Sequence, residues 1–188
     1  MATHAHPSHS NSGAMLVGAG IGAGLAFLGM VGRKLAVQAP TALAGEWDKA
    51  LAAEHDMALA LFDKLRDVPA DADSKRTLLL MQLKHALGKH ALEEENAIYP
   101  AMRDAGMEAE ADALNGDHGY VKQYLYDLTD LVKDDAAFQT RLAAFRTDIE
   151  SHMRREEDEL FPRLRQALDH QAANRLTRRM NREGLKLA

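Results

Sequence analysis

The sequence contains no cysteine, which excludes disulfide bonds, thiolate zinc sites and cysteine nucleophiles. Any metal bound by the protein must therefore be held by nitrogen and oxygen ligands. Aromatic residues make up only 5% of the chain, and no segment has a strand pattern that competes with helical periodicity. Alanine, leucine, glutamate and lysine are abundant instead, which predicts an all-α protein. The net charge of −5 argues against nucleic-acid binding, which usually needs a basic surface.

The N-terminal region lacks charge over a long stretch. Residues 1–12 are small and polar, and we expect a disordered tail there. Residues 13–32 contain no charged residue, and a helix of this length would span a hydrocarbon core of ~30 Å. We therefore predict a transmembrane helix over residues 13–34. The alternative is a soluble assembly in which these glycine-rich helices pack together.

The residues around this segment predict its orientation and its packing. Arg33 and Lys34 follow the apolar stretch, whereas no lysine or arginine precedes it. By the positive-inside rule, the chain crosses the membrane once and its body stays in the cytoplasm. Gly18 and Gly22 have the spacing at which two membrane helices approach closely. This spacing predicts a homo-oligomer. The alternative is a span of small residues that packs against no partner helix.

Residues 46–168 follow a linker at 35–45 and contain four segments with helical periodicity. Because the connections between the segments are short, we predict an up-down-up-down four-helix bundle. The apolar positions run from Trp47 to Leu65, from Leu79 to Met102, from Leu114 to Val132 and from Leu142 to Leu168.

Polar residues interrupt the apolar face of each predicted helix. Every face carries a histidine, and in two helices a glutamate follows four residues later, on the same side of the helix. A single such residue is more often a hydrogen-bonded core residue than a ligand. A buried carboxylate is costly unless it is paired or bound to a metal, so the whole set predicts a metal site. The candidate ligands are His55, His90, Glu94, His118, His152 and Glu156.

The two histidine–glutamate units belong to an internal repeat. The segment HALEEENAIYP at 90–100 aligns with HMRREEDELFP at 152–162, an offset of 62 residues, and His55 and His118 are 63 residues apart. Two helix pairs related by a pseudo-two-fold axis would bring their ligands to one centre, as a two-metal site requires. The order of these motifs resembles the hemerythrin-like (HHE cation-binding) domain family over residues 46–168.

The resemblance implies two non-haem iron ions bridged by Glu94 and Glu156, with the four histidines as terminal ligands. Oxygen-carrying hemerythrins have a fifth histidine one turn after the third-helix ligand, where this chain has Lys122. The chain is therefore similar to the four-histidine, two-glutamate variants, which include iron-centre repair proteins. A tyrosine could fill the remaining coordination position, and Tyr124 and Tyr126 are the candidates.

Three more glutamates, Glu93, Glu95 and Glu157, adjoin the candidate ligands. We expect all three to be solvated. The repeat pairs Glu95 with Glu157, so the alternative for these two is that they orient ligand imidazoles. His85 is predicted to lie off the ligand face.

Residues 169–188 form a basic segment that we expect to be a helical extension. The fourth helix of such a bundle ends beside the start of the first, so we predict that this segment contacts anionic membrane lipid. A solvated extension is the alternative, and the cluster is too short and too poor in aromatics to favour nucleic acid. Its basic residues include Arg175, Arg178, Arg179, Arg182 and Lys186.

Together these features predict a membrane-anchored di-iron protein that binds, senses or scavenges dioxygen or a related small oxidant. The first alternative is a redox enzyme or iron-centre repair protein that acts on peroxide or nitric oxide at the same centre. The second alternative is a metal-free structural bundle anchored to the membrane.

Overall fold

The computed structural model describes residues 45–188, and the predicted tail, transmembrane helix and most of the linker lie outside them. All regular structure in residues 45–188 is helical, which confirms the all-α prediction. None of the helices in this part of the chain is long and apolar enough to cross a membrane. The transmembrane helix at 13–34 therefore stays a prediction.

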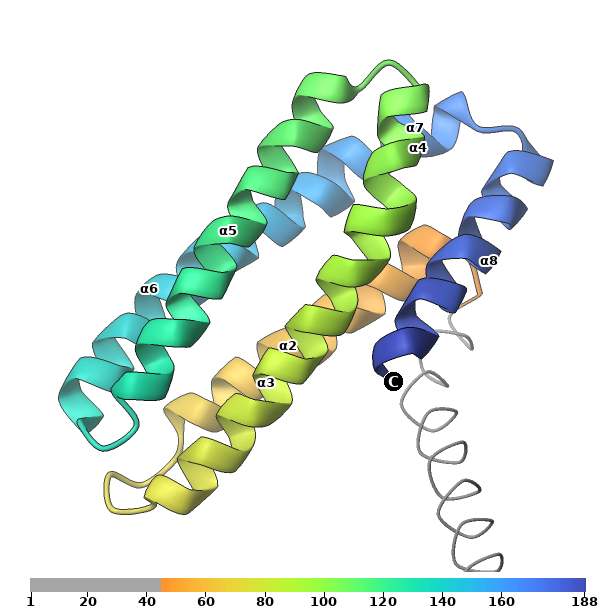
Figure 1. Cartoon of the computed structure of the whole chain (residues 1–188). Helices are drawn as coiled ribbons and strands as arrows, with labels where there is room; N and C mark the ends of the chain where they lie inside the picture. The colour runs from red at the N-terminus through yellow and green to blue at the C-terminus, as the bar shows by residue number, and fades with distance from the viewer. Residues whose placement is uncertain (1–44) are drawn as a thin grey trace, which may run out of the picture.

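The helices between Trp47 and Ala167 form four long rods, which lie side by side with successive rods running in opposite directions (Figure 1). The first and third rods are single α-helices, whereas the second and fourth each contain a short π-helical turn. The rods are α2 (Trp47–Arg66); α3 (Asp73–Glu93), η1 (Glu94–Ile98) and α4 (Tyr99–Asp104); α5 (Glu108–Asp130); and α6 (Asp135–Arg155), η2 (Glu156–Leu160) and α7 (Phe161–Ala167).

Local sequence explains two of the rod boundaries. Asp134 accepts a hydrogen bond from the backbone N–H of Ala137 at 3.1 Å and so caps the start of α6. Gly106 has a φ of +77° in the turn between α4 and α5, a conformation that a side chain would strain.

The two π turns lie at equivalent positions of the repeat. Each begins at the glutamate of a histidine–glutamate unit and ends two residues before a proline, Pro100 or Pro162. Proline has no N–H to donate, and its ring crowds the carbonyl of residue i−4 in an α-helix. We attribute the π turns to these prolines, because a wider turn accommodates the missing hydrogen bond.

The π turns change which side chains share a face. In a regular α-helix, a residue five positions after a glutamate points about 140° away from it. In η1, the backbone N–H of Tyr99 instead bonds the carbonyl of Glu94, and in η2 that of Phe161 bonds the carbonyl of Glu156. Tyr99 and Phe161 therefore lie one turn from the glutamate of their own unit.

The apolar core is divided into two clusters with a polar layer between them. Along α2, for example, Leu51 belongs to one cluster and Ala58 to the other, and His55 lies between them. Apolar packing on both sides of this layer thus holds the polar side chains in place.

Helix α8 (His170–Leu187) folds back along the bundle beside α3 and η1 (Figure 1). Asp169 caps its start, and its residues Leu176 and Met180 are buried in the core. The Thr177 hydroxyl accepts a hydrogen bond from the backbone N–H of Trp47 at 3.2 Å. The basic segment is therefore a separate helix that packs beside the start of α2.

Candidate metal centre

The six predicted ligands converge in the polar layer, and each rod contributes one histidine. The Nε2 atoms of His55 and His90 lie 3.0 Å apart. On the other side of the centre, Nε2 of His118 lies 3.3 Å from Oε2 of Glu94. His152 exposes 8% of its side chain, and the other five ligands are buried.

The donor atoms form two groups that share a carboxylate. Glu94 belongs to both groups. The Glu156 carboxylate also reaches both sides, because Oε2 lies 3.4 Å from Nε2 of His55 and Oε1 lies 3.4 Å from Nε2 of His152. This arrangement suits two cations with two carboxylates between them. One group contains His55, His90, Glu94 and Glu156, and the other contains Glu94, His118 and His152.

Three buried atoms in this cluster have no hydrogen-bond partner: Oε1 of Glu94, Oε2 of Glu156 and Nε2 of His152. A buried polar atom without a partner costs about 1–3 kcal/mol, so native proteins seldom leave three of them together. Carboxylate oxygen and imidazole nitrogen are both ligands for iron, manganese and zinc. The donor atoms therefore fit a metal centre.

Burial and charge oppose each other in this cluster. Burial alone would lower the pKa of His90, but the carboxylates of Glu94 and Glu54 raise it well above its usual value. Burial alone would raise the pKa of Glu94, but His90 and His118 lower it well below its usual value. Imidazoles and carboxylates thus stabilise each other's charged forms, and metal cations can replace the protons in that role.

A carboxylate also lies within hydrogen-bonding distance of Nδ1 on each of the four histidines. Such a bond fixes the orientation of an imidazole and directs its Nε2 lone pair toward a metal. The pairs are His55 with Glu157 at 2.5 Å, His90 with Glu54 at 3.2 Å, His118 with Glu95 at 3.0 Å, and His152 with Asp117 at 3.2 Å.

This outer set was predicted only in part. Glu95 and Glu157 contact ligand imidazoles, as the alternative prediction for these two residues states. Glu54 and Asp117 were missed, although each directly precedes a ligand histidine in the sequence. Each of these two carboxylates bonds the histidine of a neighbouring rod, and the sequence spacing alone does not show this.

The Tyr99 hydroxyl reaches the centre, a contact that was not predicted from the sequence. Its oxygen lies 3.0 Å from Nε2 of His118, and it donates a hydrogen bond to Oε2 of Glu94 at 3.1 Å. Burial and the charge of Glu94 raise the pKa of Tyr99 well above its usual value. Tyr99 therefore remains a neutral hydrogen-bond donor in this structure.

The prediction that Tyr124 or Tyr126 fills the remaining coordination position is wrong. Tyr124 donates to Asp148 at 2.5 Å, and Tyr126 is 64% exposed. Lys122, at the position of the fifth histidine of oxygen carriers, exposes 70% of its side chain and pairs with Glu95. His85 is half-buried and belongs to neither group of donors.

Glu93 was predicted to be solvated, and this prediction is wrong because it is fully buried. Lys89, also buried, donates to Glu93 at 3.0 Å and to Glu54. Burial and the nearby Glu54 raise the pKa of Glu93 to about 8. Burial would also raise the pKa of Glu54, but His90 and Lys89 lower it. These three residues form a buried charged network behind His90, which we call the Lys89 network (Glu54, Lys89 and Glu93).

No match was found among curated proteins, and none among solved structures. The family described as "Hemerythrin HHE cation binding domain" matches residues 48–164, a range that contains all six converging ligands and Tyr99. The match confirms the resemblance that the histidine–glutamate repeat indicates. The chain therefore belongs to the hemerythrin HHE cation-binding domain family.

Proposed function

We propose that the six converging residues hold two iron ions and that the protein uses them to bind dioxygen or a related small oxidant. The observation that carries the proposal is the shared position of Glu94 and Glu156, each of which reaches donors on both sides of the centre. Imidazole and carboxylate ligands suit iron. Bound iron supplies the reversible electron transfer that chemistry with small oxidants requires.

The protein's own residues prepare this centre for a small ligand. The outer carboxylates hold the imidazoles in fixed orientations, and the apolar clusters on both sides exclude bulk water. Tyr99 offers a neutral hydroxyl that can donate to a ligand with partial negative charge.

The alternative is an enzyme that reduces peroxide or nitric oxide, or that releases iron for repair, at the same centre. Tyr99 favours this alternative, because a hydroxyl beside the donor atoms can pass a proton to a substrate. The two functions differ in turnover. Spectra of the reduced protein that change with dioxygen and revert when it is removed would support binding. Steady consumption of peroxide or nitric oxide would support the enzyme. If the protein shows neither response, both proposed functions are contradicted.

We further propose that the protein is held at a membrane with its bundle in the cytoplasm. The basic residues of α8 are exposed, whereas Glu183, the one acidic residue within this helix, is buried. Because Thr177 bonds Trp47, this basic face lies beside the start of the bundle, where the linker from the predicted transmembrane segment arrives. Each basic residue near an anionic leaflet contributes about 1 kcal/mol.

Vesicle sedimentation tests this contact. A chain that begins at residue 45 should bind phosphatidylserine vesicles, and Arg178→Gln with Arg182→Gln should weaken that binding. The matched control is Lys64→Gln with Lys133→Gln, at exposed positions outside α8. Equal binding by both double variants would contradict the lipid contact. Release of the full chain from membranes by high salt without detergent would contradict the transmembrane anchor.

A further inference from the structure

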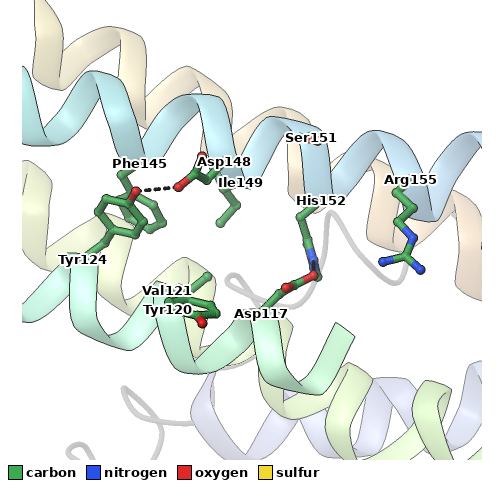
Figure 2. A pocket seen from close by; sticks show the side chains of 10 residues that line it. All are labelled: Asp117, Tyr120, Val121, Tyr124, Phe145, Asp148, Ile149, Ser151, His152 and Arg155. Atoms are coloured by element: carbon green, nitrogen blue, oxygen red, sulfur yellow. Dashed lines mark hydrogen bonds and ion pairs between the residues drawn. The ribbon is translucent and has the colours of Figure 1, made fainter. Parts of the chain in front are cut away.

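Two hollows lie on the α5–α6 side of the metal centre. The outer pocket has a volume of about 290 Å³ and lies between α5 and α6, whose side chains line it (Figure 2). The inner cavity has a volume of about 10 Å³ and is lined by three candidate metal ligands, His90, His118 and His152.

A thin partition separates the two hollows. Val121 of α5 and Ile149 and His152 of α6 line both of them. Ile149 is 4% exposed, and Val121 is half-buried. Two aliphatic side chains and one imidazole therefore stand between the outer pocket and the cavity at the metal centre.

The lining of the inner cavity restricts what it can hold. Apart from the histidines, its walls are the apolar side chains of Leu87, Ala91, Val121, Ile149 and Met153. A volume of about 10 Å³ is close to the minimum for a single water molecule. Such a space admits a small uncharged molecule but not an ion together with its hydration shell, and the apolar walls offer such an ion no replacement for lost water.

The repeat shows how the two halves of the centre differ on this side of the bundle. The residues equivalent to Ser151 and Arg155, which line the outer pocket, are Lys89 and Glu93, 62 positions earlier in the sequence. Asp117, which also lines the pocket, is equivalent to Glu54, 63 positions earlier. In the first half, these equivalent positions form the buried Lys89 network.

Helix α8 adds to this difference between the halves. It packs against α3 and η1, which carry Lys89, Glu93 and the ligand Glu94 (Figure 1). The corresponding flank of α6 carries the open outer pocket instead. A second surface pocket, near α2 and α7, is lined by Asp48, Glu157 and Phe161 among others, and includes none of the six ligands.

We propose that Val121 and Ile149 form a gate through which an uncharged small molecule passes from the outer pocket to the metal centre. The proposal rests on the proposed iron site and adds the route and the size limit of its ligand. The donor group on this side contains Glu94, His118 and His152, and Oε1 of Glu156 lies 3.4 Å from Nε2 of His152. His118 and His152 line the inner cavity together with His90 of the other group, so a molecule admitted by the gate arrives beside candidate ligands of both groups.

Ligand association rates test the gate. The reduced, iron-loaded full chain is mixed with dioxygen or nitric oxide, and the association rate constant is measured by stopped flow. Ile149→Ala should raise this rate constant, and Ile149→Phe should lower it, each by about tenfold, which corresponds to a modest change in barrier height. Val121→Leu, at a half-buried position, should also lower the rate constant and serves if Ile149→Phe does not fold. The control is Leu142→Ala, a truncation of a buried residue of α6 that lines neither hollow.

A second readout does not depend on iron. Xenon is titrated into metal-free protein whose helicity has been checked by circular dichroism, and the methyl resonances of Val121, Ile149 and Met153 are followed. Because the wild-type cavity is close to the minimum for one water molecule, xenon should shift the resonances of Val121 and Met153 little in wild type and much more in Ile149→Ala, in which the cavity is enlarged. Association rates that are the same in wild type and all gate variants would overturn the gate even if iron binds. If no iron binds but xenon still binds Ile149→Ala more tightly than wild type, the proposed function would be overturned and the cavity would stand.

Discussion

The Tyr99 hydroxyl lies 3.0 Å from Nε2 of His118, whereas its equivalent in the second repeat, Phe161, stacks on His55 with the ring centroids 6.4 Å apart. Both aromatic residues follow the glutamate of their unit by five positions, and both are aligned by a π turn. One half of a pseudo-symmetric centre therefore has a hydroxyl donor where the other has an apolar ring.

Replacement of Tyr99 by phenylalanine tests the role of this hydroxyl. Tyr99→Phe should retain the metal, because the six ligands are unchanged, and should lose about 1 kcal/mol of stability with the buried hydrogen bond. The optical spectrum and the reduction potential of the iron-loaded protein should shift. Tyr124→Phe, which removes a hydrogen bond to Asp148 outside the centre, should shift neither. Identical spectra and potentials for Tyr99→Phe and wild type would contradict a role at the centre.

The outer carboxylates should contribute unequally to stability. Glu54→Gln and Glu157→Gln should each weaken metal binding by about 10–100-fold, because each carboxylate orients a ligand imidazole. Glu54→Gln should in addition lower the free energy of unfolding by about 3 kcal/mol, because it breaks a buried charge pair with Lys89. Glu157 exposes 38% of its side chain, and its loss should destabilise the fold much less.

Chelator competition and urea denaturation measure these two effects. Glu159→Gln, at an exposed position two residues after Glu157, is the control and should change neither. Equal stability of the Glu54→Gln and Glu157→Gln variants would show that the Lys89 network does not stabilise the fold.

The sequence predicted the rods and the convergence of the six candidate ligands because both depend on α-helical periodicity. His90 and Glu94, four residues apart, share a helix face whatever the surrounding fold, so their spacing alone indicates the site. Tyr99 follows Glu94 by five residues, and only the π turn brings it onto the same face. The Tyr-Pro and Phe-Pro pairs were visible signals, but their effect on the helix was not anticipated.

Contacts between rods could not be predicted in the same way. Glu93 looks like a surface residue in the sequence, and its burial depends on Lys89 and on the packing of α8 beside η1. The apolar residues continue at helical spacing from Leu168 to Met180, as they would in one long helix. A bend nevertheless separates α7 from α8 and turns α8 back along the bundle. Periodicity shows that a face is apolar, but it does not show which neighbour covers that face.

Iron binding should release protons at neutral pH. The pKa values of His55, His90 and His118 are raised despite burial, because the neighbouring carboxylates stabilise their charged forms. A raised pKa means that these imidazoles hold protons at pH values where free histidine has lost them, and a metal must displace those protons. Iron affinity should therefore increase as the pH rises above about 6.5, the ordinary pKa of histidine. Calorimetry in buffers of different ionisation enthalpy counts the released protons, and a count of zero at pH 7 would contradict this prediction.

Metal removal should lower the thermal stability of the bundle. A ligand that binds only the folded state stabilises it by about 4 kcal/mol at a thousandfold excess over its dissociation constant. For a chain of this size, that stabilisation corresponds to a shift in melting temperature of roughly 10 °C. Circular dichroism melts with and without a chelator measure the shift, and restored iron should restore the melting temperature. Identical melting curves would show that the cluster is satisfied without metal.

The most direct test of the di-iron centre is the iron content of the purified full chain, measured alongside its optical spectrum. Wild-type protein from iron-supplied cells should contain about two irons per chain, as expected for a two-metal site. Glu156→Gln, which removes a carboxylate charge that reaches both sides of the centre, should contain less than one iron per chain and lose the associated absorption. The exposed neighbour variant Glu159→Gln should match wild type. Well-folded wild-type protein without iron, or equal iron content in both variants, would contradict the di-iron centre.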